Sequence, residues 1–526
     1  MSKSLSLGRT SAKGGFNILW GLMISSIISA VGVMIVAGIL SEEEFGLVTV
    51  ALIGPNIIMF IKDLGLDQAT IKHATQYKTE GNTKRLESIL VTGTTFEIVF
   101  GTIFTLISIL ASGFMANILE RPTIVPLIQI ASFIILAGAL LKAAQSAFIG
   151  YERIKLHSVT LIIHSVLKTG LMILLVTLSF GTYGAIIGNA VSYLSAGIIS
   201  VILLYLVIIK QIKTPKSQLE IMSTLRTMLK FGLPLSVSAM LVGVLSQFYS
   251  FLVAIYSTDL IMGNYQIALN FVVLVNIFSS SLTTILFPTF SKIKAHEDPK
   301  TLKDVFQYSV KYATLLVVPL TFAVMVLSEP GVASLFYDKY EYAPLLLSLY
   351  VITYLYSAAG SLSASSLINS QGKTKVNMKI TILTFMVGIV LSLVLIPYFG
   401  VYGLIATNSL ASVPGLVVSL WWIKKNYNVT VNWVSSIKIL VASAFSAGLT
   451  YFVINSLSLS NWICLVLGAA VFLGSYIFVA PLIGAITYGD TQNLKDMLKS
   501  LGPLALVIDV LLYPIEKITS ATKKET

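Results

Sequence analysis

Four ionisable residues lie inside long apolar stretches of the sequence, where a charge needs a specific reason to be kept. They are Glu97, Lys142, His164 and Lys168. On membrane-insertion scales an ionised side chain near the bilayer centre costs roughly 2.5–3.5 kcal/mol. Lysine and histidine can bind an anion, and a carboxylate can take up a proton or a sodium ion. One hypothesis is that the three basic residues bind an anionic substrate and that Glu97 couples its movement to an ion gradient.

A structural explanation of the same charges stays open. Glu97 could pair with Lys142 or Lys168 and hold helices together. His164 and Lys168 are four residues apart, so they share one face of a helix. Weaker candidates for contact with a substrate are three amide residues in apolar stretches: Asn56, Gln247 and Asn276. Amide side chains commonly join helices through hydrogen bonds, so the structural explanation applies to them as well.

Membrane-spanning helices would position these residues. The chain has 526 residues, of which 56% are hydrophobic and only 11% charged, more apolar surface than a soluble protein of this size could bury. The apolar stretches fit helices that cross a bilayer and do not fit the short alternating strands of a barrel. We expect about fourteen spans, at approximately 16–39, 44–62, 87–113, 124–148, 156–178, 182–209, 229–256, 263–289, 305–328, 343–369, 376–396, 402–423, 434–455 and 462–486.

The positions of Lys and Arg predict the orientation of these spans. Most of the 35 Lys and Arg residues lie in the N-terminus, in every second loop or in the C-terminal tail. The intervening loops contain Arg121 and Lys339 among several acidic residues. Basic short loops stay in the cytoplasm, so we expect a multi-pass protein of the cell membrane with both termini cytoplasmic. This pattern explains the formal charge of +12 without nucleic acid as a partner, and it favours membrane lipids.

An internal repeat divides the spans into two halves. The segment Phe180-Gly181-Thr182-Tyr183-Gly184 recurs 219 positions later as Phe399-Gly400-Val401-Tyr402-Gly403. Two spans separated by only a few residues need glycine for a tight reversal, and the tyrosines would lie at the membrane interface. Each half contains six spans, an even number, so both run in the same direction through the membrane.

The repeat does not extend to the ionisable residues. The same offset places Leu316, Ser361, Leu383 and Val387 at the positions of the four ionisable residues. The scaffold is therefore repeated and the charges are not. We predict an all-α polytopic membrane protein with four segments: a six-helix bundle at 1–218, a second six-helix bundle at 219–425, two further transmembrane helices at 426–486, and a cytoplasmic amphipathic tail at 487–526.

Catalytic and metal-binding patterns are not found in the sequence. No pair among the four histidines has the spacing of metal ligands. The single cysteine, Cys464, excludes a thiol cluster. We therefore expect no enzyme activity, no metal and no cofactor, apart from coupling to a proton or sodium gradient.

Several motifs near the N-terminus resemble one family. The first span follows Lys13-Gly14-Gly15 and leads into Ser41-Glu42-Glu43-Glu44-Phe45-Gly46, and Asp63-Leu64-Gly65-Leu66 and Tyr77-Lys78-Thr79-Glu80-Gly81 come next. The order resembles the polysaccharide-biosynthesis, or oligosaccharide flippase, branch of the multidrug/oligosaccharidyl-lipid/polysaccharide exporter superfamily. The resemblance covers most of the chain. It implies a MATE-like V-shaped pair of bundles, alternating access, and a polyprenyl-(di)phosphate-linked oligosaccharide moved from the inner to the outer leaflet for surface polysaccharide or glycoprotein assembly.

One departure from the family affects the expected site. Many relatives have an arginine near the end of the first span, where this chain has Gly38. Membrane depth then favours Lys142 and Lys168 as the phosphate-binding cations, with Arg9 and Lys13 at the inner mouth. We expect the protein to act as a monomer.

Two other function classes stay open. A cation-coupled exporter of drugs or small molecules, from the same superfamily, would need an acidic group in its cavity, and Glu97 is the one carboxylate found in the middle of a span. A membrane enzyme such as a glycan polymerase would usually need a large outer loop, and the longest outer segment here is about 329–342.

Overall fold

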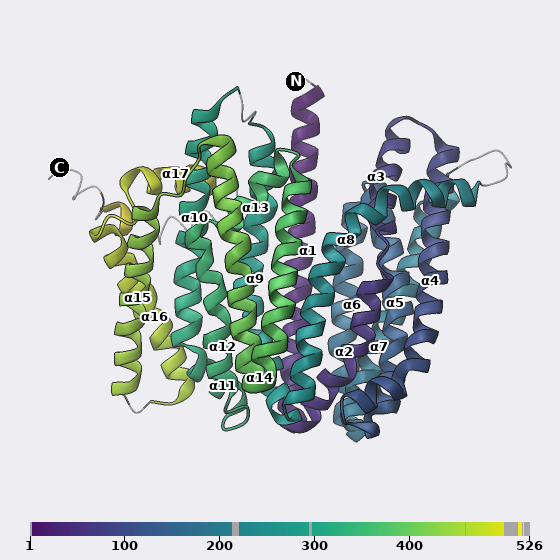
Figure 1. The fold of residues 1–526 in the computed structure, drawn as a ribbon, viewed down its shortest axis with the longest axis horizontal. Helices are drawn as coiled ribbons and strands as arrows, with labels where there is room; N and C mark the ends of the chain where they lie inside the picture. The colour runs from purple at the N-terminus through teal and green to yellow at the C-terminus, as the bar shows by residue number, and fades with distance from the viewer. Residues whose placement is uncertain are drawn as a thin grey trace. The chain divides into compact units, whose positions relative to one another are not determined.

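The computed structural model describes residues 3–212, 220–293, 297–457, 459–498, 514–517 and 519, with side chains from Trp20 onward except at 234, 235, 238, 284, 285, 288 and 494–498. In this part of the chain every regular element is a helix (Figure 1). Eleven of the described helical segments are long and apolar enough to cross a membrane, and a bent pair brings the number up to 12. The prediction of an all-α, multi-pass membrane protein is confirmed.

Two of these segments are longer than one crossing requires. Ile154–Gln211 has 58 residues and Thr374–Tyr427 has 54, whereas about 20 residues cross a bilayer. Each is interrupted at a glycine with the same backbone conformation: φ 52° and ψ −133° at Gly181, φ 53° and ψ −129° at Gly400. A Cβ atom would be strained in this region, so the repeat places glycine at both reversals. Each segment has the length for two crossings, and the number fourteen stays a prediction.

The described residues form two compact units. The first contains Met1–Asn270 and Thr381–Thr407. Its elements are α1 (Lys3–Ile39), α2 (Glu42–Lys62), α3 (Leu66–Thr79), α4 (Thr83–Ile118), η1 (Pro122–Ile124), α5 (Val125–Gly150), α6 (Ile154–Leu175), η2 (Val176–Phe180), α7 (Gly181–Val207), η3 (Ile209–Gln211), α8 (Ile221–Tyr256), the beginning of α9 (Asp259–Ser291) and the middle of α14 (Thr374–Tyr427).

The second unit contains Phe271–Ile380 and Asn408–Thr526. The predicted tenth span is broken there, because the helix bends by 55° at Gly360. The elements are the remainders of α9 and α14, with α10 (Pro299–Val326), α11 (Ser328–Phe336), α12 (Ala343–Val351), η4 (Ile352–Ala359), α13 (Ser361–Ser370), α15 (Trp433–Ser456), α16 (Asn461–Leu482) and α17 (Tyr488–Leu498). The segment boundaries predicted from the repeat stay predictions, and most of the expected amphipathic tail lies outside the described residues.

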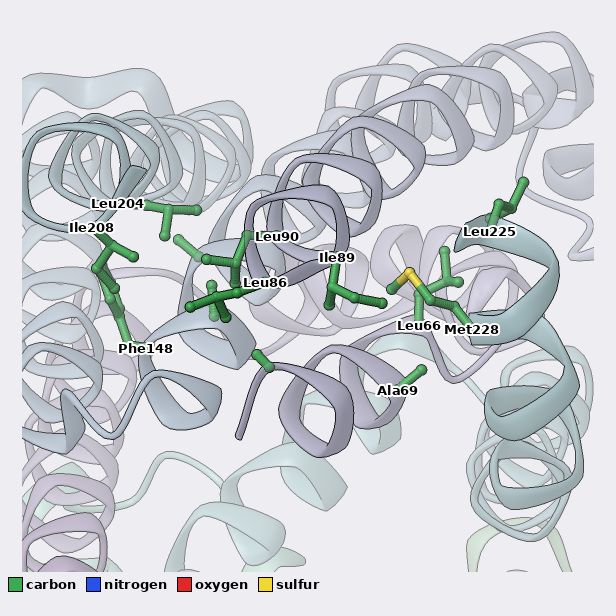
Figure 2. Close-up of a cluster of buried hydrophobic side chains, with 13 residues drawn as sticks. Leu66, Ala69, Leu86, Ile89, Leu90, Phe148, Leu204, Ile208, Leu225 and Met228 are labelled. Carbon is green, nitrogen blue, oxygen red and sulfur yellow. The ribbon is translucent and has the colours of Figure 1, made fainter. Parts of the chain in front are cut away.

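An apolar core holds together one end of the first unit, where α3 lies (Figure 2). Leu66 of α3, Ile89 of α4, Phe148 of α5 and Met228 of α8 are all at least 98% buried. This core fixes the short turn between α2 and α3, and it fixes the first turns of α8 against α4. Both features position charged residues that are described below.

Candidate functional site

Glu97 is buried, and it is paired. Its carboxylate lies 2.5 Å from the ammonium nitrogen of Lys62, and the two side chains are only 7% and 4% exposed. Glu97 belongs to α4 and Lys62 is the last residue of α2, so the pair joins these two helices. The sequence points to Lys142 or Lys168 as partners of Glu97, and the structure pairs it with neither.

Lys142 of α5 has a different partner. Its ammonium group donates to Asp63, the residue directly after Lys62, over 2.8 Å. Asp63 also accepts a hydrogen bond from the backbone of Gly65, which has a φ of 73°. Burial disfavours the ionised form of Asp63, but the neighbouring Lys142 ammonium outweighs it and holds the pKa of this carboxyl below its ordinary value. Asp63 is therefore ionised at neutral pH, and the Lys142 side chain remains 48% exposed.

Lys168 differs from Lys62 and Lys142, which both pair with a carboxylate. It lies half-buried on α6, and among the described residues no carboxylate lies within ion-pair distance of its ammonium group. His164, one turn earlier, is buried with Nε2 unbonded, and its ring centroid lies 3.9 Å from that of Tyr193 on α7. Of the predicted site residues, His164 contacts Tyr193, and Lys168 lies one turn from His164 on α6.

The remaining predicted site residues are less informative. Asn56 on α2 and Gln247 on α8 are half-buried in the first unit. Asn276 on α9 is exposed and belongs to the second unit. Arg9 and Lys13 lie in the first turns of α1, and their side chains are outside the described part of the structure. Substrate contact by these five residues stays a prediction.

The buried pair gives a test of the role of Glu97. Glu97→Gln should leave the Lys62 ammonium buried without a counter-charge and lower the free energy of unfolding by about 3–5 kcal/mol. The double variant Lys62→Met with Glu97→Leu should recover most of this loss, because an apolar pair avoids the desolvation cost. Thermal unfolding measures stability, and transport is measured on the same samples.

A matched control is Glu152→Gln, which removes the ion pair with Lys78, whose side chains are 60% and 33% exposed respectively. We expect it to change stability by less than about 1 kcal/mol. A stable double variant of Lys62 and Glu97 that transports normally would rule out ion coupling by Glu97. A stable variant without transport would support the coupling role.

A second polar cluster lies where α2 and α9 begin and α4 ends. Arg121, between α4 and α5, donates from Nε to Asp259 over 2.6 Å. Its other nitrogens donate to the carbonyl oxygens of Leu119, Ala254 and Ser257 at 2.6–2.9 Å. The fork of the guanidinium group is thus bonded to one carboxylate and three carbonyl groups, an arrangement that lysine could not reproduce.

The same cluster contains a close approach of two helices. Asn264 of α9 donates to the carboxylate of Glu42 over 2.6 Å. A Cβ atom at Gly46 would lie 1.8 Å from the Asp259 carbonyl oxygen, so only glycine allows this contact. We call Arg121, Asp259, Glu42 and Asn264 the Arg121 latch. It joins the beginning of α9 to α2 and to the α4–α5 connection, all within the first unit.

Comparison with known families identifies the kind of protein that contains these features. A model of a family described as polysaccharide biosynthesis protein matches residues 35–345, more than half of the chain. The chain belongs to this polysaccharide biosynthesis protein family. The resemblance expected from the sequence motifs is therefore confirmed. Comparison with curated protein sequences found no match.

Solved structures support the fold of this polysaccharide biosynthesis protein. A lipid II flippase, MurJ, in an inward closed conformation has a TM-score of 0.71 at 16% identity, over 88% of this chain and 98% of the other. An inward-facing multidrug resistance MATE family transporter of the MOP superfamily has a TM-score of 0.62 at 15% identity, over 78% and 98%. At these identities the likeness shows the fold, and it confirms the predicted MATE-like architecture.

Two groups of site residues in this polysaccharide biosynthesis protein are not predicted from the sequence. Lys62 lies at the end of an apolar stretch, where lysine is ordinary, and Asp63 belongs to a loop motif. Arg121 does carry a signal, because it is one of only two basic residues in the otherwise acidic loops. A basic residue in a loop that is expected to be acidic indicates that the residue has a specific partner.

Proposed function

We propose that this protein moves an oligosaccharide linked to a polyprenyl phosphate or diphosphate from the inner to the outer leaflet of the cell membrane. Lys168 carries the proposal. It is a half-buried cation on an apolar helix, with no described carboxylate as counter-charge. A phosphate group of the substrate would supply that charge. His164 and Tyr193 would offer polar groups beside it, while the lipid tail could remain in the bilayer.

Lys142 would be the second phosphate-binding cation. Its ammonium group is half exposed, so a substrate phosphate could share it with Asp63. This arrangement favours a flippase over the cation-coupled exporter, since the one mid-span carboxylate, Glu97, is neutralised by Lys62. Binding and conformational change suffice for such transport, so no chemical reaction and no enzyme activity are proposed.

Alternating access would need contacts that close the substrate site to one side of the membrane and that break and form again in each transport cycle. The Arg121 latch is suited to this role, because polar contacts between helix ends can be replaced by water when the helices separate. From the distribution of Lys and Arg we expect both termini in the cytoplasm and the latch on the outer side. We propose that the latch closes the outer side while Lys168 is open to the inner leaflet.

Reconstitution into vesicles tests this function. A polyprenyl-diphosphate sugar with a fluorescent label would be placed in both leaflets, and a membrane-impermeant quencher would report how much of it reaches the outer leaflet. We expect protein-dependent flipping of the labelled diphosphate and little flipping of labelled phosphatidylcholine. Equal movement of both lipids would contradict the proposal. Gradient-driven export of a cationic dye without lipid flipping would favour the exporter.

A further inference from the structure

A cavity of about 490 Å³ lies in the first unit between the first turns of α4 and of α8. It is lined by the cations Lys84 and Arg85, the carboxylate of Glu220, and hydroxyl groups that include those of Ser223 and Thr224. None of the residues assigned to substrate contact lines it. Tyr77 of α3 also lines the cavity. Figure 1 shows α3 and the first turns of α8 at the same end of the first unit.

The charges in this cavity are not balanced. Neither Lys84 nor Arg85 has a carboxylate within ion-pair distance among the described residues, and the Arg85 guanidinium lies 5.7 Å from the ring centroid of Tyr77. Glu220 accepts a hydrogen bond from the Ser223 hydroxyl over 3.1 Å. Two cations against one carboxylate leave a net positive charge in a pocket with hydroxyl groups. This combination suits an anion that accepts several hydrogen bonds.

The repeat provides a comparison within the same chain. A cavity of about 290 Å³ in the second unit is lined by Asp304 and Gln307, which follow Arg85 and Ser88 by the repeat offset of 219 positions. There the chain supplies its own anion, Asp490, which is 3% exposed. Asp490 accepts from Lys311 over 2.5 Å and from the Thr487 backbone over 2.8 Å.

In the first cavity the one lining carboxylate, Glu220, accepts from the Ser223 hydroxyl, and among the described residues it forms no ion pair with Lys84 or Arg85. The two cavities differ in their charged groups: Asp304 stands at the repeat position of Arg85, and Lys311, which binds Asp490, stands at the repeat position of Thr92. Lys84 and Arg85 could therefore pair with an anion from outside.

The surroundings of the first cavity are those of a membrane surface. On α8 the side chain of Met222 is 72% exposed and that of Ile221 is 38% exposed, beside the polar face that lines the cavity. Leu225 and Met228 follow Ile221 by four and seven residues on the same side of α8 and are buried in the core (Figure 2). A helix with exposed apolar residues next to cations is typical of an element that lies at the lipid headgroups.

We propose that the cavity between α4 and α8 binds a phosphate group, carried by an anionic lipid headgroup or as free phosphate. Lys84 and Arg85 pair with the phosphate. The Thr224 hydroxyl lies 2.8 Å from that of Ser88 and can donate to the phosphate when Ser88 donates to Thr224. The bound group joins α4 to the first turns of α8, where the second half of the repeat begins. Binding at this position therefore stabilises the folded protein without taking part in transport.

Titrations of the full-length protein in a neutral detergent test this inference. The probes are short-chain phosphatidylglycerol, short-chain phosphatidylcholine and inorganic phosphate, and the readout is the midpoint of thermal unfolding. The wild type should be stabilised by phosphatidylglycerol and not by phosphatidylcholine. Lys84→Ala with Arg85→Ala should weaken binding about tenfold or more, because each charged hydrogen bond contributes about 1.5–3 kcal/mol.

A matched control is Lys424→Ala with Lys425→Ala at the end of α14, where the Lys425 nitrogen lies 5.0 Å from the Trp421 ring centroid. This control should bind like the wild type. Glu220→Gln removes the one carboxylate in the wall and should tighten binding several-fold, so the test does not depend on one variant.

Stabilisation by phosphatidylglycerol alone would identify a lipid headgroup as the source, and equal stabilisation by inorganic phosphate would identify free phosphate. Wild-type binding by the Lys84 and Arg85 variant, weaker binding by Glu220→Gln, or equal effects of the two lipids would overturn the inference.

Discussion

Lys168→Met should lower the rate of flipping about 10- to 100-fold and leave the protein folded in the membrane. The variant keeps the length of the side chain and removes its charge. A hydrogen bond to a charged group contributes about 1.5–3 kcal/mol, and each 1.4 kcal/mol corresponds to a factor of ten. The variant should therefore transport the diphosphate-linked substrate more slowly. Its stability should not fall, because no described carboxylate is paired with Lys168.

Stability distinguishes this role of Lys168 from a structural one. An unpaired cation in an apolar helix destabilises the fold, so Lys168→Met should keep or raise the midpoint of thermal unfolding. Lys168→Arg retains the charge and should keep part of the transport rate. Lys424→Ala, an exposed lysine at the end of α14, serves as the control. Normal flipping by Lys168→Met would exclude Lys168 from the site, and a strongly lowered midpoint would indicate a structural role.

The fold could be predicted from the sequence because its strongest signals are local. A run of apolar residues and the side on which lysines occur depend on the bilayer alone, so they require no knowledge of packing. The two reversals at Gly181 and Gly400 were visible for a similar reason. A backbone with φ near 52° and ψ near −130° favours glycine wherever it occurs, so the repeat retains glycine at both positions.

The partners of the buried charges could not be predicted, because pairing depends on which helix faces meet. Glu97 and Lys142 were found from their depth, but Lys62 and Asp63 were not, since a charged residue at the end of a span is ordinary. The turn after α2 sends these two adjacent side chains to different helices: Lys62 pairs with α4 and Asp63 with α5. The sequence contains the charges, and only the packing of α2, α4 and α5 determines the pairs.

Arg121→Ala should open the closure formed by the Arg121 latch. The substitution removes one ion pair and three hydrogen bonds to carbonyl oxygens, and water can replace them because the Asp259 side chain is already 24% exposed. Changes of this kind shift a conformational equilibrium by about 1–3 kcal/mol, or roughly 5- to 150-fold. The open form should therefore become more populated, and transport should slow because the closed form is needed in each cycle.

The single cysteine makes this shift measurable. Cys464 is buried and can be replaced by serine, after which Ala254→Cys introduces one thiol at a position that is fully buried in this structure. A membrane-impermeant thiol reagent added from outside should label this position faster when Arg121 is replaced by alanine. Lys339→Ala, the other basic residue in the acidic loops, should leave labelling unchanged. Equal labelling with and without the Arg121 substitution would contradict a gating role.

Exchanging the charges of Arg121 and Asp259 distinguishes the contribution of the ion pair from that of the hydrogen bonds to carbonyl oxygens. Arg121→Asp with Asp259→Arg restores the attraction but moves the guanidinium group away from the Leu119, Ala254 and Ser257 carbonyl oxygens. Labelling and transport should then lie between those of the wild type and of Arg121→Ala. Full recovery would show that the ion pair alone closes the latch. No recovery would show that the fork of Arg121 acts through the backbone at the ends of α4 and α8, and Arg121→Lys should then behave like Arg121→Ala.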